Sequence, residues 1–227
     1  MEARRRLLDA GYGEPLLRAL LEETGGLAPG AAVLDVGCGE GYYLGSLLAA
    51  RGVEAHGVDL SAAAIDLAAR RHPGATWIVA NADRALPYAT GAFDLVLSID
   101  ARLNPPEMRR VLKAGGRLLV AVPGADDLVE LRAAVLGEPV LKDRLERAAA
   151  RLAGDFALEG RRTVRGAARL GPDEIRDALA ATYRGGRASR WERIAGISAL
   201  ETTLSHELAR FLPSPSGTVG PSVPTSP

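Results

Sequence analysis

Cysteine, histidine and aromatic residues are scarce in this chain of 227 residues. It has one cysteine, Cys38, and three histidines, and aromatic residues make up 4% of it. A single cysteine excludes an internal disulfide and a zinc site built from several cysteines, so we expect no bound metal. No histidine or acid is identified by sequence as a partner for Cys38, which is therefore expected to be a small turn residue rather than a nucleophile.

Long apolar runs are also absent. No segment reaches the roughly 18–20 apolar residues that cross a bilayer, and the basic start is not followed by the apolar core of a signal peptide. We therefore expect a cytoplasmic protein without a membrane partner. Lys and Arg (28) balance Asp and Glu (28), which gives a formal net charge of +0. This balance argues against non-specific nucleic-acid binding by the whole surface, although a local basic patch can still bind RNA.

The most informative stretch is residues 33–43, with the sequence VLDVGCGEGYY. Its apolar start is typical of a strand that is covered on both faces. Gly37, Gly39 and Gly41 then form a turn in which the backbone can adopt positive φ and approach a ligand closely. The helix predicted to follow directs its free N–H groups and the positive end of its dipole at this turn. The pattern predicts a site for an anionic or polar ligand.

Two acids extend this site. Asp35 lies in the first strand, and Asp59 ends the next apolar run, residues 53–58. An acid at the end of the second strand is placed to accept hydrogen bonds from ribose hydroxyls. The turn does not match the dinucleotide pattern G-x-G-x-x-G. It resembles the first motif of the class I S-adenosylmethionine-dependent methyltransferases, which implies S-adenosylmethionine as the cofactor.

Strands and helices alternate along the chain. Strands are expected at residues 33–36, 53–58, 76–80, 91–98, 117–122, 156–170 and 202–211, and helices at residues 3–24 with a break near Gly11, 42–50, 62–71, 107–113, 126–135, 140–152 and 172–181. This order predicts a doubly wound, Rossmann-like, mainly parallel α/β sheet of seven strands. The C-terminal strand is expected to be antiparallel and to lie at an edge, with His206 in a structural position.

The chain divides into three predicted regions. Residues 1–30 are expected to form a helical segment and residues 31–212 the methyltransferase domain. Residues 213–227 are rich in Pro, Ser, Gly and Thr, which predicts a disordered tail.

Residues 104–107, Asn-Pro-Pro-Glu, allow two interpretations. They resemble the N-P-P-[YF] signature of amino-group methyltransferases, which holds a planar nitrogen for attack. Asn followed by Pro is also typical of a helix start, with Asn as the cap and Pro at the first position. We favour the cap, because the tetrapeptide lies several residues past the strand end and has Glu107 in place of the aromatic residue.

The carboxyl ends of parallel strands meet at one edge of a sheet, where ligands bind. With the class I resemblance, this predicts a cofactor site made of Tyr12, Asp35, Gly37, Cys38, Gly39, Gly41, Tyr42, Asp59, Leu60, Asn81, Ala82, Asp83 and Ser98. The resemblance places the adenine-binding acid at Ala82, so the neighbouring Asn81 or Asp83 is expected to meet the adenine amino group. Glu40 either contacts the methionine amino group or is solvated.

Four stretches share the motifs of one family. Residues 4–16 resemble its segment R-R-x-F-L-x-x-G-x-Y-x-P-L, and the paired tyrosines after Gly41 match its first motif. Residues 57–65 match its G-x-D-x-S…A-I, and residues 123–131 resemble its P-G-P-x-H-L-x-E-L. The family is that of the bacterial 23S rRNA guanine-N-methyltransferases, which methylate a ring nitrogen in a hairpin loop. The resemblance, over about residues 3–212, implies 23S rRNA as a partner.

Several positions depart from this family. The chain begins at the family's pre-domain segment, so its N-terminal zinc-binding domain is expected to be absent. The loop Ile99-Asp100-Ala101-Arg102 stands where the family has I-Y-A-P, and Asp127 replaces a histidine. These changes fall where the methyl acceptor should lie. They leave open a small-molecule methyltransferase as a second reading and a non-catalytic domain that binds the cofactor as a third.

Asp100, at the end of the fourth strand, is the candidate general base for the guanine nitrogen, and an Asp that caps a turn is the alternative. Candidate phosphate contacts are Arg161, Arg162, Arg165, Arg184, Arg187 and Arg190, and candidate stacking residues are Tyr183 and Trp191. Aromatic stacking of this kind is typical of RNA recognition, but a string of arginines is also typical of a solvated face.

Overall fold

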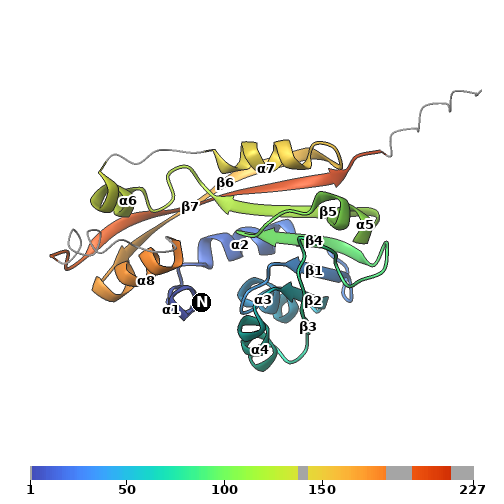
Figure 1. The fold of residues 1–227 in the computed structure, drawn as a ribbon, viewed down its shortest axis with the longest axis horizontal. Coiled ribbons are helices and arrows are strands. Elements are labelled where there is room, and N and C mark those ends of the chain that lie inside the picture. The colour runs from blue at the N-terminus through green and yellow to red at the C-terminus, as the bar shows by residue number, and fades with distance from the viewer. Residues whose placement is uncertain (1, 138–142, 183–195, 216–227) are drawn as a thin grey trace, which may run out of the picture.

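The computed structural model describes residues 2–137, 143–182 and 196–215, and Figure 1 shows its elements. The strands are β1 (Ala32–Val36), β2 (Glu54–Asp59), β3 (Thr76–Val79), β4 (Phe93–Ile99), β5 (Leu112–Pro123), β6 (Phe156–Leu170) and β7 (Leu200–Pro213). The helices are α1 (Glu2–Asp9), α2 (Glu14–Glu23), α3 (Tyr42–Arg51), α4 (Ala62–Arg71), α5 (Pro105–Val111), α6 (Val129–Leu136), α7 (Arg144–Leu152) and α8 (Pro172–Thr182).

Within the described residues, the seven strands form one sheet in the order β3-β2-β1-β4-β5-β7-β6. β1 pairs in parallel with β2 and β4, β2 with β3, and β4 with β5. β7 runs antiparallel to both of its neighbours, β5 and β6. The predicted seven-stranded, doubly wound, mainly parallel α/β fold with an antiparallel C-terminal strand is therefore confirmed.

The place of β7 corrects one prediction. The last strand was expected at an edge of the sheet, but β7 lies between β5 and β6, and β6 forms the edge. Figure 1 shows β6 and β7 as a long pair of strands beside β5. Leu208, Ala209 and Phe211 of β7 are buried. Alternating apolar residues indicate a strand, but they do not distinguish an edge from the interior, because its neighbours come from other parts of the chain.

Helices cover both faces of the sheet. On one face, Met108 of α5 and Leu152 of α7 pack into a core with residues of β1, β4 and β5. On the other face, Leu20 of α2 and Leu44 of α3 pack against the alternate residues of the same strands. Successive residues of β1 belong to opposite cores, as the twofold period of a strand requires. The expected burial of the first strand, β1, on both faces is confirmed.

A third apolar cluster lies beyond the ends of β5 and β6. It joins Leu131 of α6, Ile175 and Leu179 of α8, and Leu170 at the end of β6. Leu7 of α1 packs against this cluster from the N-terminal segment. The cluster extends the apolar interior to the edge of the sheet where parallel strands end, which is the edge that carries the predicted site.

Most predicted boundaries lie close to those of the structure, but Leu112 and Lys113, which were expected in a helix, begin β5. The helix at residues 62–71 and the strand at residues 156–170 match α4 and β6 residue for residue. The two helices predicted between residues 126 and 152 begin later, as α6 and α7. Residues 216–227 of the predicted tail lie outside the described part, and the division of the chain at residue 30 stays a prediction. In the described part, no helix is long and apolar enough to span a bilayer.

Asn104 has another role than the predicted cap. The prolines do open a helix, α5, but the Asn104 side chain makes no capping hydrogen bond. Its Nδ2 donates instead to the carbonyl oxygen of Ala82 at 2.8 Å. A competing partner 22 residues away in sequence therefore replaces the local cap and ties the start of α5 to the loop after β3.

A substitution at Gly57 tests the packing of β2 on β3. A Cβ atom on Gly57 would lie 2.3 Å from Cζ3 of Trp77 and 2.9 Å from Sγ of Cys38. Gly57→Ala is therefore expected to lower the free energy of unfolding by about 1–3 kcal/mol through overpacking. Urea denaturation measures the change.

Gly26→Ala is the matched control, because a Cβ atom on Gly26 would have nothing within 4 Å. We expect this variant to unfold close to the wild type. Equal stability of both variants would contradict the assigned contact between Trp77 and Gly57.

Candidate functional site

The glycine turn between β1 and α3 has the conformation that the sequence predicts. Gly37, Gly39 and Gly41 have φ of +79°, +55° and +78°. The amides of Gly37 and Cys38 donate to the carbonyl oxygen of Val58 at 2.7 and 3.1 Å. The turn is therefore tied to the end of β2, the strand that carries the second predicted acid.

The space around the three glycines differs. A Cβ atom on Gly37 would lie 2.5 Å from Cβ of Ala101, and one on Gly41 would lie 2.5 Å from the ring of Trp77. A Cβ atom on Gly39 would have only Nη1 of Arg4 near it, at 3.8 Å. Protein atoms therefore fill the approach to Gly37 and Gly41, and the turn is open at Gly39, beside Arg4.

Asp59 lies at the end of β2, as predicted. One carboxylate oxygen accepts the amide of Gly39 at 2.9 Å, and the other accepts the amide of Ser61 at 2.8 Å. A carboxylate has about four acceptor positions, so Asp59 can hold the turn and still accept a hydrogen bond from a ligand hydroxyl.

The predicted adenine side is apolar and exposed next to polar loop residues. Leu60 is 69% exposed and Val79, at the end of the neighbouring strand, is 50% exposed. Oδ1 of Asn81 accepts the amide of Asp83 at 3.0 Å, and the Asp83 carboxylate pairs with Arg102 at 2.9 Å. The loop is thus held by its own polar groups and by Arg102, while Leu60 and Val79 present apolar surface to solvent.

Three buried polar atoms beside the turn have no hydrogen-bond partner among the described residues. They are Oδ1 of Asp35, Oε1 of Glu40 and Oγ of Ser98, on residues that are 2%, 2% and 0% exposed. An unpaired buried polar atom costs about 1–3 kcal/mol, so such atoms are normally satisfied. The alternative that Glu40 is solvated is therefore wrong. These three buried atoms therefore keep unused hydrogen-bonding capacity beside the turn.

The environment of Asp35 changes its acidity. Burial raises the pKa of Asp35 to about 7, the charge of Arg4 opposes this rise, and the charge of Asp59 adds to it. A cationic ligand group next to Asp35 would favour the ionised carboxylate.

Three predicted site residues have other surroundings. The Tyr42 ring packs against Gly13, where a Cβ atom would lie 2.8 Å from the ring. The Tyr12 hydroxyl donates to the carbonyl oxygen of Arg169 at 3.2 Å. Burial raises the pKa of the Cys38 thiol, which disfavours the thiolate that a nucleophile requires. In the described residues, no group of three or more His, Cys, Asp and Glu side chains could hold a metal ion.

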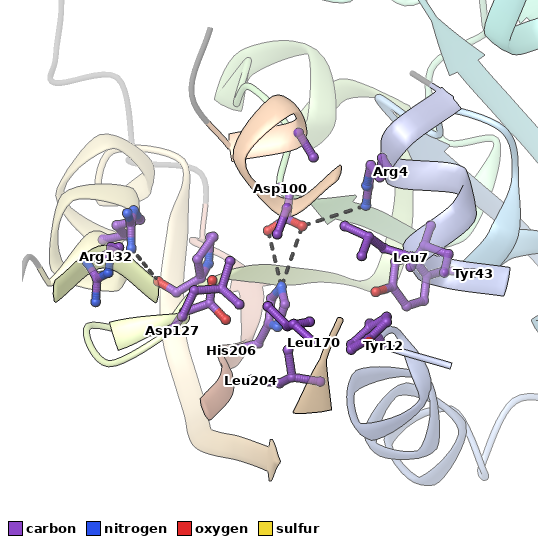
Figure 2. A pocket seen from close by; sticks show the side chains of 16 residues that line it. Arg4, Leu7, Tyr12, Tyr43, Asp100, Asp127, Arg132, Leu170, Leu204 and His206 are labelled. Carbon is purple, nitrogen blue, oxygen red and sulfur yellow. Dashed lines mark hydrogen bonds and ion pairs between the residues drawn. The ribbon is translucent and has the colours of Figure 1, made fainter. Parts of the chain in front are cut away.

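A cavity of about 510 Å³ lies beyond the turn, where β4 and β5 end. Its lining combines the ends of elements that are far apart in sequence: Arg4, Leu7 and Leu8 of α1, Tyr12, Tyr43 of α3, Asp100, Pro123, Asp127, Leu128, Arg132, Arg144, Leu170, Ala178, Ala181, Leu204 and His206. Figure 2 shows that Arg4, Asp100 and His206 point toward one another in this cavity.

Asp100, the predicted base, is paired in the cavity. Nε2 of His206 lies 3.4 Å from both Asp100 oxygens, and Nη2 of Arg4 lies 3.6 Å from one of them. Burial raises the pKa of Asp100, but the hydrogen bond and charge of His206 and the charges of Arg4 and Arg144 outweigh it, so the pKa is lowered. Asp100 is therefore ionised at neutral pH, and the view of it as a simple turn cap does not describe these contacts.

Sequence reasoning missed Arg4, Tyr43 and His206 as site residues. Arg4 stands in a run of three arginines and His206 in an alternating strand, so neither has a local signal. Tyr43 follows Tyr42 in the motif, and the structure places the second tyrosine, not the first, at the cavity. All three depend on contacts across the fold.

The arginines proposed for phosphate contacts are partly described. Arg162 pairs with Glu22 at 2.8 Å and Arg165 with Asp126 at 2.8 Å, and Arg161 lies 4.0 Å from Glu146. These three lie on the edge strand β6 with acidic partners. The other predicted RNA contacts, Arg184, Arg187, Arg190, Tyr183 and Trp191, lie outside the described residues.

Comparison with known proteins agrees with this geometry. Residues 33–121 match the family model described as "Methyltransferase domain". A 23S rRNA (guanine(748)-N(1))-methyltransferase of Streptomyces fradiae is 38% identical over 178 residues, which are 76% of this chain and 63% of that protein. A candidate 23S rRNA (guanine-N(1)-)-methyltransferase of Micromonospora griseorubida is 31% identical over 93% of this chain and 78% of that protein.

The chain belongs to the 23S rRNA (guanine-N(1)) methyltransferase family. The family model ends at Ala121, whereas the likeness to the Micromonospora relative extends over β6 and β7 as well. The chain spans less than two thirds of the length of the Streptomyces relative. Among solved structures, a methyltransferase of Geobacter sulfurreducens in complex with S-adenosylhomocysteine has a TM-score of 0.54 at 17% identity and covers 88% of this chain and 91% of its own. This neighbour supports the class I fold.

The raised pKa of Asp35 predicts a pH-dependent stability. A folded-state pKa of about 7 against an unfolded value near 4 means that the folded state binds one more proton between these pH values. The free energy of unfolding should therefore fall by about 1.4 kcal/mol per pH unit over this range. Asp35→Asn removes this loss, so the variant gains stability relative to the wild type as pH rises from 5 to 8.

Urea denaturation at several pH values measures the difference. Asp94→Asn is the control, because the hydrogen bond from Lys113 lowers the pKa of Asp94, and its difference from the wild type should not vary between pH 5 and 8. Parallel curves for the wild type and Asp35→Asn would contradict an elevated pKa.

Proposed function

We propose that the protein is an S-adenosylmethionine-dependent methyltransferase that methylates the N1 atom of a guanine in 23S rRNA. The observation that carries the cofactor is the group of buried, unpartnered oxygens of Asp35, Glu40 and Ser98 beside the open glycine turn. The names of two relatives, at 38% and 31% identity, support guanine N1 as the acceptor.

The site residues suit the parts of this cofactor. The Asp35 and Glu40 carboxylates are proposed to hold the ammonium group of the methionine moiety, since both are buried acids without a partner on one oxygen. Arg4, which lies above Gly39, is proposed to meet the neighbouring carboxylate. Asp59 is proposed to accept the ribose hydroxyls, and Leu60 and the loop at residues 81–83 to contact adenine. When bound, the cofactor supplies a methyl group on a sulfonium.

The protein's own part in the reaction is alignment and proton removal. An in-line transfer gains most from holding donor and acceptor in contact, which is worth of order 7–11 kcal/mol in favourable cases. Asp100 is proposed to receive the N1 proton, because it is an ionised carboxylate that lines the cavity next to the turn.

A small-molecule acceptor is the second candidate. Two observations favour it: the chain has no net charge, and three arginines of β6, Arg161, Arg162 and Arg165, already pair with acids. Both reduce the positive surface that is available for RNA phosphates.

Transfer of labelled methyl groups from S-adenosylmethionine distinguishes the candidates. We would offer unmodified 23S rRNA fragments in one reaction and a small-molecule extract of the native host in another. Label in the rRNA that maps to N1 of a guanine is the expected result. Label in the extract alone would reject the rRNA substrate, and no label in either, with cofactor binding intact, would favour a non-catalytic binding domain.

Binding of S-adenosylhomocysteine tests the assignment of Arg4. Arg4→Gln is expected to weaken binding about tenfold or more, since loss of one charged hydrogen bond costs roughly 1.5–3 kcal/mol. Isothermal titration calorimetry measures the affinity. Arg5→Gln is the matched control, because Arg5 stands next to Arg4 on α1 but does not line the cavity. Equal affinity of the two variants would reject the role of Arg4.

A further inference from the structure

The cavity adjoins the proposed methyl donor site. Asp100 directly precedes Ala101, whose Cβ occupies the space next to Gly37 of the turn. Arg4 lies near Gly39 and also lines the cavity. A molecule in the cavity is therefore next to whatever occupies the glycine turn, so this cavity is the place for the acceptor.

One wall of the cavity is apolar. Leu7, Leu128, Leu170 and Leu204 line it together with Ala178. All of these except Leu204 belong to or border the third apolar cluster. Ligand pockets of about 300–1,000 Å³ with apolar walls and a few polar groups bind compact organic molecules. The volume and the apolar lining suit a heterocyclic ring.

The polar wall presents a donor beside an acceptor. Nε2 of His206 lies 3.4 Å from Oδ2 of Asp100, and both side chains face the cavity (Figure 2). Two arginines that also line the cavity bond to the backbone. Arg132 donates to the carbonyl oxygen of Ala125, and Arg144 donates to the carbonyl oxygens of Pro123 and Gly124. The pair His206–Asp100 therefore offers a donor and an acceptor side by side in the cavity.

The charges around His206 define its protonation. Burial lowers the pKa of His206, but the hydrogen bond with Asp100 and the charges of Asp100 and Asp127 outweigh it, and the pKa is raised. The charge of Arg4 lowers the pKa of His206. His206 is thus favoured as a cation that donates, next to an Asp100 that accepts.

Backbone strain coincides with the same cavity. Among the described residues, the non-glycine residues with positive φ are Asp100 at 54° and Leu128 at 50°. Both line the cavity. Left-handed backbone at a non-glycine residue costs of order 1 kcal/mol or more and clusters at binding sites, where it positions side chains. The positive φ of these two residues does not depend on the charges around His206, and it identifies the same cavity.

We propose that this cavity receives a nucleobase turned out of the RNA strand and recognises its ring N–H beside a carbonyl, with Asp100 accepting from the N–H and His206 donating to the oxygen. The proposal rests on the proposed function and names the part of the acceptor that the site reads. A base must leave its stack to enter such a pocket, and its Watson–Crick edge is then read by hydrogen bonds. Guanine presents this edge, and adenine presents the reverse order of donor and acceptor.

The same contacts account for the proton that leaves the ring nitrogen and for the charge that develops on the base. The ring nitrogen forms its bond to the methyl carbon while the carbon–sulfur bond of the donor breaks and the sulfur keeps the electron pair. The N–H proton passes to the Asp100 carboxylate and from there to solvent. His206 stabilises the negative charge that develops on the neighbouring carbonyl oxygen, which is an electrostatic contribution to the transition state.

Nucleoside binding to the full chain, loaded with S-adenosylhomocysteine, tests the proposal. The imidazole NMR signals of the three histidines report on the site, with His56 and His72 as internal references because neither lines the cavity. Guanosine and inosine should shift the His206 signals, and adenosine should bind at least about tenfold more weakly, since a site built to hydrogen-bond one edge rejects its reverse. In the variants, saturation-transfer NMR of the nucleoside signals measures binding, because two of the variants lack the His206 imidazole. His206→Phe and Asp100→Asn should lose the preference for guanosine, and His206→Gln, which keeps a donor, should retain part of it.

Glu207→Gln is the control variant, because Glu207 neighbours His206 on β7 but bonds to Thr163. Retained binding of S-adenosylhomocysteine shows that each variant is folded. Equal affinity for guanosine and adenosine would overturn the proposal, as would an unchanged preference in His206→Phe. No guanosine-dependent shift up to about 10 mM, a concentration that corresponds to about 2.7 kcal/mol of binding, would also overturn it.

The outcome is separable from the rRNA assay. Methylation of 23S rRNA with a cavity that is indifferent to guanosine would reject this proposal alone. Selective guanosine binding without methylation of 23S rRNA would reject the rRNA substrate and leave the cavity's specificity established.

Discussion

The antiparallel pairing of β7 with β5 is the constraint on which the site depends. It aligns His206 with Pro123, at the end of β5, and so brings the histidine to the edge where Asp100 follows β4. It also anchors the segment before α6, because Asp127 accepts the amide of Ser205 at 2.9 Å. One strand from the end of the chain thus completes both the sheet and the polar wall of the cavity.

Charge is concentrated where the parallel strands end, although the chain has no net charge. Asp35 and Glu40 are buried with unpaired oxygens, whereas Asp100 has His206 and Arg4 close to it. Burying an uncompensated acid opposes folding. A protein tolerates this cost where a ligand supplies the missing partner, which is the basis for proposing Asp35 and Glu40 as cofactor contacts and Asp100 as the base.

The N-terminal helix α1 links these two parts of the site. Arg4 lies over the glycine turn and beside Asp100, and Leu7 joins the apolar cluster that walls the cavity. Arg6 holds the helix on α8 through two hydrogen bonds to Asp177, at 2.7 and 2.5 Å. The glycine turn and the cavity are therefore both in contact with α1.

The sequence by itself determined the alternation of strands and helices, the glycine turn and the position of Asp59. These follow from local periodicity and from backbone conformations that glycine allows, so a single stretch contains the information. Only the tertiary structure decided that β7 lies inside the sheet, that Glu40 is buried and that Asp100 pairs with His206. Arg4, Asp100 and His206 are about a hundred residues apart from one to the next, and no local pattern records which distant side chains the folded sheet brings into contact.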